Sequence, residues 1–295
     1  MRNFEFFVDS STDMSLALAQ EFGLRVLPMT LLMNGNDYPE DFWQTISAKE
    51  FYTALRNGTP ASTSQISREK FVQLFTECAA KGRDVLFVPL SAGISGTYEG
   101  ACSAAAEVIE EYPEAKIRVV DSMNATIGHG LLCFNASAQA KANDWDVNQT
   151  AAWLEEHRHK TWALFTVDDL MFLHRGGRLG RMSAVAGSLL GIKPSLWVNE
   201  EGKLELKGKV RGRRAALDAL VADMGKCVAP GAELATVTLA HGDCVEDAQY
   251  VREQVQAKYT VKRFITVMLG AVIGAHAGPG TVALFFECDV ARHKL

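Results

Sequence analysis

The sequence predicts an α/β fold in two domains, an N-terminal parallel-sheet α/β/α domain and a C-terminal α+β domain with a mixed sheet. In the first half, apolar runs of four to six residues alternate with helix-like segments of ten or more, which is typical of parallel strands covered on both faces. In the second half this alternation is less regular and a hairpin is indicated around the turn NEEGK. A length of 295 residues suits two domains, which we place at 1–158 and 159–295.

The expected elements of the first domain follow this alternation along the chain. Ser47 and Ser67 each precede a segment with helical spacing and are candidate N-caps. We expect strands at 4–12, 24–34, 84–91 and 117–124, and helices at 14–23, 47–58, 67–82, 96–112 and 125–142.

The second domain is expected to contain strands, one hairpin and amphipathic helices. One apolar stretch, 264–286, carries no formal charge and is nominally long enough to span a bilayer. Because His276 and the Gly-Pro-Gly at 278–280 interrupt it, we interpret it as two buried strands joined by a turn, with no integral membrane segment. The other elements expected are strands at 161–170, 195–210 (a hairpin) and 232–241, and helices at 183–191, 213–225 and 244–259.

Composition narrows the class of protein. The formal net charge of −5, with acidic and basic residues interspersed, argues against a nucleic-acid partner, which normally requires a basic face. The six cysteines are scattered, with neither C-x-x-C pairs nor zinc-site spacing, which predicts reduced, mostly buried thiols and no metal site. The N-terminal segment lacks the long apolar run of a signal peptide. Together these features indicate a cytoplasmic protein.

Four polar clusters are expected at the carboxyl ends of strands, where doubly wound sheets bind ligands. They are VDSST (8–12), ASTSQIS (61–67), LSAGISGTYEGA (90–101) and VVDSMN (119–124). Two interpretations stay open: the four loops converge on one site, or their Ser, Thr and Asp residues cap helices and close turns.

The third cluster, 90–101, is the most informative. Its glycines match neither dinucleotide nor P-loop spacing, and Ser95 lacks the G-x-S-x-G context of a nucleophile elbow. What remains is Ser95 and Thr97 at a helix N-terminus, with Gly96 allowing close approach of a ligand. Free N–H groups, hydroxyls and the helix dipole favour an anion there, and a carboxylate suits the site as well as a phosphate.

Two further side chains are candidates. His276 is a polar ring within an apolar stretch, and such a ring needs partners. Arg178 follows two glycines, so it either holds a carboxylate or pairs with Asp168 or Asp169 as a structural clamp.

The ordered motifs resemble those of the DegV family over essentially the whole chain. They are FVDSSTDMS, TSQIS, SAGISGTYEGA, VVDSMNATIGHG, HRGGRLG, GIKPSL and IGAHAGPGTVALFF. The resemblance implies a bacterial cytosolic protein of two α/β domains with a long-chain fatty acid between them. It also implies a separate fatty acid kinase catalytic subunit, which phosphorylates the bound acyl carboxylate with ATP.

The resemblance also implies roles for individual residues. Thr63 and Ser95 would hydrogen-bond the carboxylate, His276 would lie beside it, and Arg178 would orient it or meet the partner. Two positions depart from the family pattern: Ile66 stands where proline is common after TSQ, and His174 where lysine or another polar residue is common. The second departure bears on partner recognition rather than on lipid binding. The small-residue segment SAVAGSLLG (183–191) and the methionine-containing LPMTLLM (27–33) are candidates to line an acyl tunnel or to pack as ordinary core.

Our leading hypothesis is a non-enzymatic fatty acid carrier that needs no cofactor. Two alternatives remain: a hydrolase or phosphoryl transferase using Ser95 or Asp9 as nucleophile with His276 as base, and an acyl-sensing regulatory module. The first alternative lacks a metal-binding carboxylate cluster or an oxyanion motif.

Overall fold

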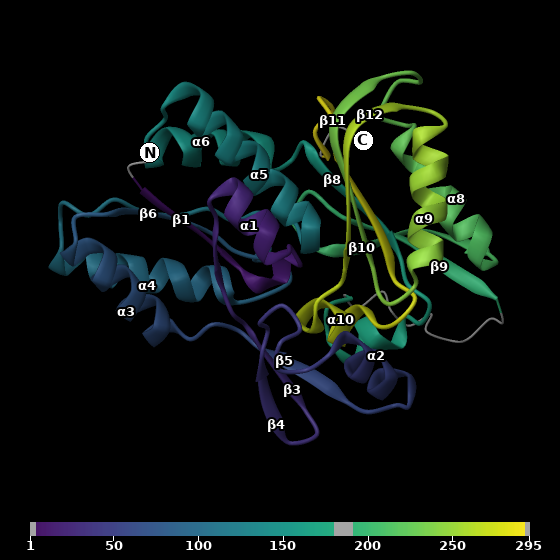
Figure 1. The fold of residues 1–295 in the computed structure, drawn as a ribbon, viewed down its shortest axis with the longest axis horizontal. Helices are drawn as coiled ribbons and strands as arrows, with labels where there is room; N and C mark the ends of the chain where they lie inside the picture. The colour runs from purple at the N-terminus through teal and green to yellow at the C-terminus, as the bar shows by residue number, and fades with distance from the viewer. Residues whose placement is uncertain (1–3, 180–190, 293–295) are drawn as a thin grey trace.

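The computed structural model describes residues 4–179 and 191–292, which fold around three sheets (Figure 1). The first is the predicted parallel sheet, in the order β2-β1-β6-β7. All of its pairings are parallel. Its strands are β1 (Phe4–Asp9), β2 (Arg25–Leu27), β6 (Asp84–Val88) and β7 (Ile117–Val119).

A small antiparallel sheet was not predicted. It has the order β4-β3-β5 and consists of β3 (Thr30–Met33), β4 (Asn36–Pro39) and β5 (Ala61–Ser64). The single strand expected at 24–34 is therefore wrong, because the chain leaves the parallel sheet at Pro28 and re-enters pairing in a different sheet. The cluster at 61–67 likewise begins on β5 of the small sheet, rather than at the carboxyl end of a parallel strand.

The third sheet is mixed and has the order β10-β9-β8-β13-β11-β12. Among the described strand pairs of this sheet, β11–β12 alone is parallel. The predicted hairpin is the β9–β10 pair. The strands are β8 (Thr161–Thr166), β9 (Ile192–Val198), β10 (Leu204–Arg211), β11 (Glu233–His241), β12 (Thr260–Met268) and β13 (Val282–Glu287). The parallel and mixed sheets confirm the predicted fold class; the division at residue 158 stays a prediction.

Helices cover the sheets in layers (Figure 1). Helices α3 and α4 pack on one face of the parallel sheet and α1, α5 and α6 on the other, while α8 and α9 cover the outer face of the mixed sheet. The described helices are η1 (Ser10–Thr12), α1 (Leu16–Phe22), α2 (Ala48–Arg56), α3 (Arg68–Ala80), α4 (Thr97–Glu111), α5 (Thr126–Asn143), α6 (Val147–His157), α7 (Met171–Arg175), α8 (Arg213–Met224), α9 (Val245–Gln256) and α10 (Ala271–Ala277). Ser47 and Ser67 are N-caps, as predicted. Of the predicted helix at 183–191, all but the last residue lies outside the described residues.

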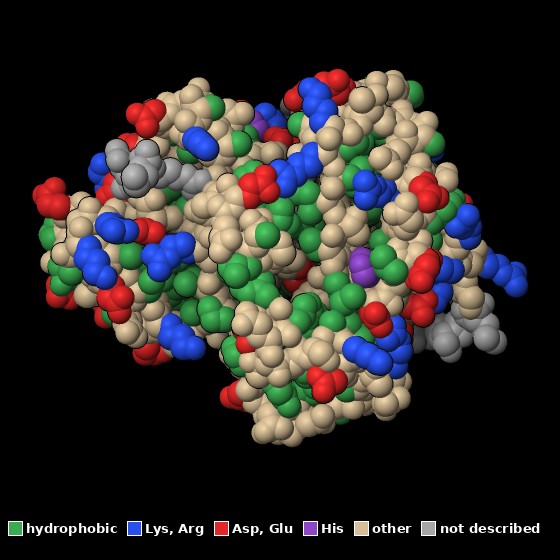
Figure 2. Space-filling view, in the orientation of Figure 1, with side chains coloured by type: hydrophobic (Ala, Val, Ile, Leu, Met, Phe, Trp, Pro, Cys, Tyr) green, Lys and Arg blue, Asp and Glu red, His purple; other side chains and the backbone are tan. Residues whose placement is uncertain are grey.

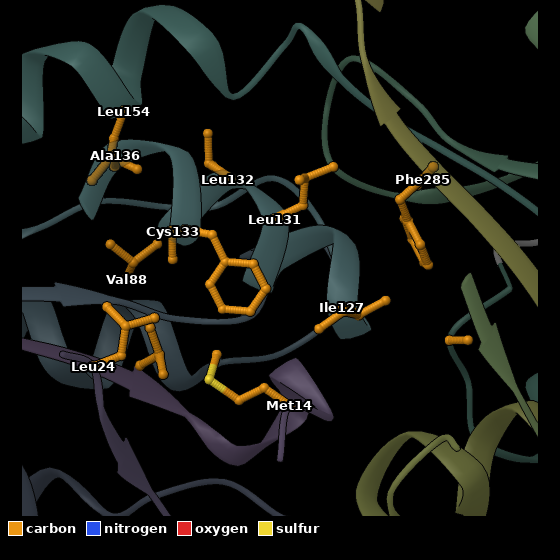
Figure 3. Close-up of a cluster of buried hydrophobic side chains, with 14 of the residues drawn as sticks. Met14, Leu24, Val88, Ile127, Leu131, Leu132, Cys133, Ala136, Leu154 and Phe285 are labelled. Carbon is orange, nitrogen blue, oxygen red and sulfur yellow. The ribbon is translucent and has the colours of Figure 1, made fainter. Parts of the chain in front are cut away.

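Helix α5 joins the two large sheets into one core. It contacts β8, β11 and β13 of the mixed sheet as well as α1 and α6. Burial on nearly every side explains its small residues. At Gly128, a Cβ atom would lie 2.2 Å from a ring carbon of Phe285, so only glycine permits this approach. Figure 3 shows Phe285 extending from β13 toward the side on which α5 carries Ile127 and Leu131.

The stretch 264–286 contains a helix that the sequence did not reveal. Strand β12 and strand β13 are separated by α10 and are not neighbours, because β11 lies between them. The expectation of two strands joined by a turn is therefore wrong in its middle part, where alanines and glycines form a short helix. None of the described helices has the length and apolar character that crossing a bilayer requires.

A buried arginine near the end of the chain connects its two halves. The guanidinium of Arg292 donates hydrogen bonds to the carbonyl oxygens of four residues: Val198, Asn199, Met123 and Arg158.

The cysteines are less buried than predicted. Of the six, two are buried and four are half-buried.

Candidate ligand-binding site

A largely apolar cavity lies between the parallel sheet, the small sheet and the mixed sheet. Its empty volume, counted together with space that is open to solvent, is about 740 Å³. Figure 2 shows apolar side chains gathered in a depression where these parts of the molecule meet. The apolar lining comes from elements far apart in the sequence: Met29, Leu90, Ile94, Ala125, Ala163, Phe165, Leu173, Val198, Leu204, Leu269, Val272, Ile273, Ala277, Ala283 and Phe285. A cavity with such a lining suits an apolar ligand.

Four of the predicted site residues line this cavity together: Thr63, Ser95, Arg178 and His276. Thr63 is on β5, Ser95 precedes α4, Arg178 follows α7, and His276 is in the last turn of α10. Separate loops therefore bring hydroxyls, an imidazole and a guanidinium to one apolar volume. None of the four carries a negative charge, so the group favours an anion.

His276, on α10, contacts Thr63 of the small sheet. Its Nε2 atom lies 2.8 Å from the Oγ1 atom of Thr63, in a hydrogen bond whose direction depends on the tautomer. Burial, together with the positive charge of Arg178, lowers the pKa of His276 to about 4. The imidazole is therefore neutral near pH 7 and can serve as a hydrogen-bond donor or acceptor.

Ser95 and Thr97 form one local unit at the start of α4. The two hydroxyl oxygens lie 2.9 Å apart, and the backbone N–H of Thr97 donates to the Oγ atom of Ser95. Thr97 is fully buried, and neither it nor Gly96 is among the residues that line the cavity. Gly96 is the N-cap of α4. Of the three residues predicted here, Ser95 is the one that lines the cavity, while Thr97 forms a hydrogen bond with its hydroxyl.

Arg178 does not form the structural clamp that was considered from the sequence. Asp168 forms an ion pair with Lys193, and Asp169 accepts a hydrogen bond from the backbone N–H of Met171. The guanidinium of Arg178 instead donates to the carbonyl oxygen of Ile94 at 3.4 Å, and also to that of Gly176. Arg178 thus connects the α7 loop to the Ser95 loop at the cavity.

Asp9, the other nucleophile considered, is a structural residue. It is fully buried, and its carboxylate accepts hydrogen bonds from the backbone N–H groups of Ser11 at 3.0 Å and Leu90 at 2.7 Å, and from the Ser11 hydroxyl. It does not line the cavity. These bonds fix the loop that leads from β6 toward Ser95.

Sequence reasoning missed two carboxylates, Asp13 and Glu40. They bind the first N–H groups of α10, which carries His276. Both lie in turn segments more than 200 residues before the helix that they cap, so no local pattern could have revealed the contact.

Comparison with known proteins assigns the chain to a family. The family model described as "Uncharacterised protein, DegV family" matches residues 3–289. The chain belongs to the DegV family. A DegV domain-containing protein of Clostridium perfringens is 37% identical over 289 residues, which covers 98% of this chain and 99% of the relative.

Solved DegV structures share the whole fold. A DegV family protein of Thermus thermophilus, described by its fatty acid binding, superposes with a TM-score of 0.85 at 29% identity and covers 98% of this chain and all of its own. A DegV lipid-binding protein of Thermotoga maritima gives a TM-score of 0.85 at 27% identity, covering 99% of this chain and 100% of its own. DegV of Bacillus subtilis, described as a fatty acid binding protein, gives 0.82 at 26% identity over 98% of this chain and 100% of its own.

Proposed function

We propose that this DegV protein binds a long-chain fatty acid, with the acyl chain in the apolar cavity and the carboxylate beside Thr63, Ser95, Arg178 and His276. One observation carries the proposal: these four side chains, from four separate segments, line the same largely apolar cavity. The fatty acid binding described for the Thermus and Bacillus relatives supports the same ligand class.

The two parts of the ligand contribute differently. Each buried methylene of the acyl chain contributes about 0.8 kcal/mol, so the tail supplies most of the affinity. A hydrogen bond to a charged group contributes about 1.5–3 kcal/mol, so the carboxylate contacts fix the orientation of the ligand. The Arg178 guanidinium adds the positive charge that a fatty acid anion requires.

The protein then presents the carboxylate to a separate kinase subunit, which forms the acyl phosphate. This step rests on the family resemblance. The location of Arg178 beside the cavity is consistent with a head group close to such a partner. A regulatory module that senses an acyl ligand would use the same site and would differ only in its partner.

A hydrolase mechanism receives less support from the geometry. A serine nucleophile needs its base within hydrogen-bond reach. Here the hydroxyl of Ser95 is hydrogen-bonded to the hydroxyl of Thr97, and the Nε2 atom of His276 is hydrogen-bonded to the hydroxyl of Thr63. The two candidate catalytic groups thus have other partners.

Native mass spectrometry of freshly purified protein tests the proposal. We expect an adduct with the mass of one long-chain fatty acid, or uptake of one palmitate or oleate by delipidated protein. Incubation with a generic ester or phosphate monoester provides the control for catalysis. Protein that carries no lipid and takes up neither fatty acid contradicts the proposal, whereas turnover that Ser95→Ala abolishes supports the hydrolase.

A further inference from the structure

Two carboxylates hold the beginning of α10 in place. The Oδ1 atom of Asp13 accepts a hydrogen bond from the backbone N–H of Gly270 at 2.9 Å. The Oε1 and Oε2 atoms of Glu40 accept from the N–H groups of Ala271 at 2.5 Å and Val272 at 2.8 Å. The N-cap residue is a glycine without a side chain of its own, so these distant residues provide the cap.

The two carboxyl groups are close to each other. A Cβ atom on residue 270 would lie 2.1 Å from the Oε1 atom of Glu40 and 2.8 Å from the Oδ1 atom of Asp13. Both oxygen atoms thus approach the same point, and carboxylates this close repel each other when both are ionised, so the pair titrates as one unit. One proton on either carboxyl group removes this repulsion.

Half-buried and acidic surroundings favour keeping that proton. Burial raises the pKa of Glu40 to about 7, partly offset by its two backbone hydrogen bonds. Burial, and then the charge of Glu40, raise the pKa of Asp13 well above its usual value.

The charged and titratable groups that act on the pair from neighbouring elements are Asp9 of β1, Asp41 after β4, and the Tyr52 phenol of α2. None of the three is a cation. At the far end of α10 lie His276 and Arg178. A surface hollow of about 850 Å³, lined by Asp13, Glu40, Phe42 and Trp43 among others, gives the pair access to solvent protons.

Helix α10 connects this pair to the proposed fatty acid site. It is only seven residues long, so a shift at its beginning reaches His276 in its last turn. Val272, Ile273, His276 and Ala277 of this helix line the cavity.

We propose that Asp13 and Glu40 are positioning residues that clamp the start of α10, and that fatty acid affinity falls when this pair loses its one proton. The inference rests on the proposed function for its ligand. While one of the two carboxyl groups is protonated, the pair holds the three N–H groups without mutual repulsion. Once both groups are ionised, repulsion moves them apart, α10 shifts, and His276 and the cavity wall move with it.

The sign of the effect on stability follows from the raised pKa. Folded protein holds the Glu40 proton more tightly than unfolded protein, whose glutamates titrate near 4.5. The stabilisation from this proton is therefore complete below about pH 4.5 and is lost as the pH rises to about 7. Glu40→Gln has no such proton to lose.

The test measures the palmitate affinity of wild type, Glu40→Gln and Asp13→Asn at several pH values. Glu110→Gln, at an exposed position of α4, is the matched control. Between about pH 6 and pH 8.5 we expect the palmitate affinity of wild type and of Glu110→Gln to fall about tenfold more than that of Glu40→Gln. A difference of one unit between the pKa of the pair in free protein and in lipid-bound protein produces a change of this size. Ionisation of palmitate itself affects all variants equally and cancels when their affinities are compared. If palmitate affinity varies with pH in the same way in wild type, Glu40→Gln and Asp13→Asn, the proposed clamp is wrong.

A second measurement separates the clamp from the proposed ligand. The NMR chemical shifts of the His276 imidazole in lipid-free protein should titrate near pH 7 in wild type and stay constant there in Glu40→Gln. This result, in protein that binds no fatty acid at any pH, would retain the clamp and refute the proposed function. Constant His276 shifts in wild type, with palmitate bound normally, would refute the clamp alone.

Discussion

Helices α4 and α10 both begin beside the cavity, but different chemical groups meet their first N–H groups. At α4 the N-cap is Gly96, and the neutral hydroxyl of Ser95 accepts from the N–H of Thr97. At α10 the carboxyl groups of Asp13 and Glu40 accept from three consecutive N–H groups. A neutral hydroxyl leaves the start of α4 attractive to an external carboxylate, whereas the start of α10 already holds its own acidic groups. One helix start is therefore suited to a ligand, and the other supports the structure.

Adding a methyl group at each helix start tests whether the two starts differ in rigidity, and the first substitution should have the largest effect. Gly270→Ala places a Cβ atom 2.1 Å from the Oε1 atom of Glu40, although the φ of −65° at this position suits alanine. Because the cap must move, we expect a loss of about 2 kcal/mol in the free energy of unfolding, measured by urea denaturation.

Gly96→Ala is the matched substitution at α4. Its Cβ atom would lie 2.5 Å from the Oε1 atom of Gln65, the end of an exposed side chain that can move away. We expect a change within about 0.5 kcal/mol. Equal losses from the two substitutions would show that the start of α10 is no more rigidly held than that of α4.

Ser95→Ala tests the ligand-binding role of the start of α4. Removing the hydroxyl takes away a hydrogen-bond donor to the carboxylate, and we expect palmitate affinity to fall about tenfold, equal to about 1.4 kcal/mol, in a fluorescence displacement titration. The free energy of unfolding should change by less than about 1 kcal/mol, since Ser95 is only half-buried. An unchanged dissociation constant would remove Ser95 from the site.

The same two helix starts show what could be predicted from the sequence. Helix α4 and its hydroxyls are contiguous, so the pattern of a strand, glycines and hydroxyls predicts both the helix and its character. Thr63 and His276 also line the cavity, but their 2.8 Å contact joins residues 213 positions apart. The cap of α10 is equally non-local. The helix itself was missed because its residues, apart from His276, are alanine, glycine and β-branched, a composition that fits a buried strand as well. Non-local pairing and this ambiguous local composition together limit prediction at this site.

The smallest effect that we expect concerns a third contact near the start of α10. The hydroxyl of Tyr52, on α2, donates a hydrogen bond of 2.8 Å to the carbonyl oxygen of Leu269, the residue before the N-cap. Burial and the charges of Asp13 and Glu40 raise the pKa of Tyr52 well above its usual value, so the phenol remains a donor at every pH used for binding.

Tyr52→Phe leaves this buried carbonyl without its donor and should cost about 1 kcal/mol of unfolding free energy, seen in urea denaturation. Tyr38→Phe, in the same hydrophobic cluster, is the matched control and should change stability by less than half as much. If the clamp of Asp13 and Glu40 suffices to position α10, palmitate affinity should change by less than about twofold in Tyr52→Phe, equal to about 0.4 kcal/mol. A larger loss of affinity at unchanged stability would mean that the Tyr52 hydroxyl, and not the carboxylates, sets the position of His276.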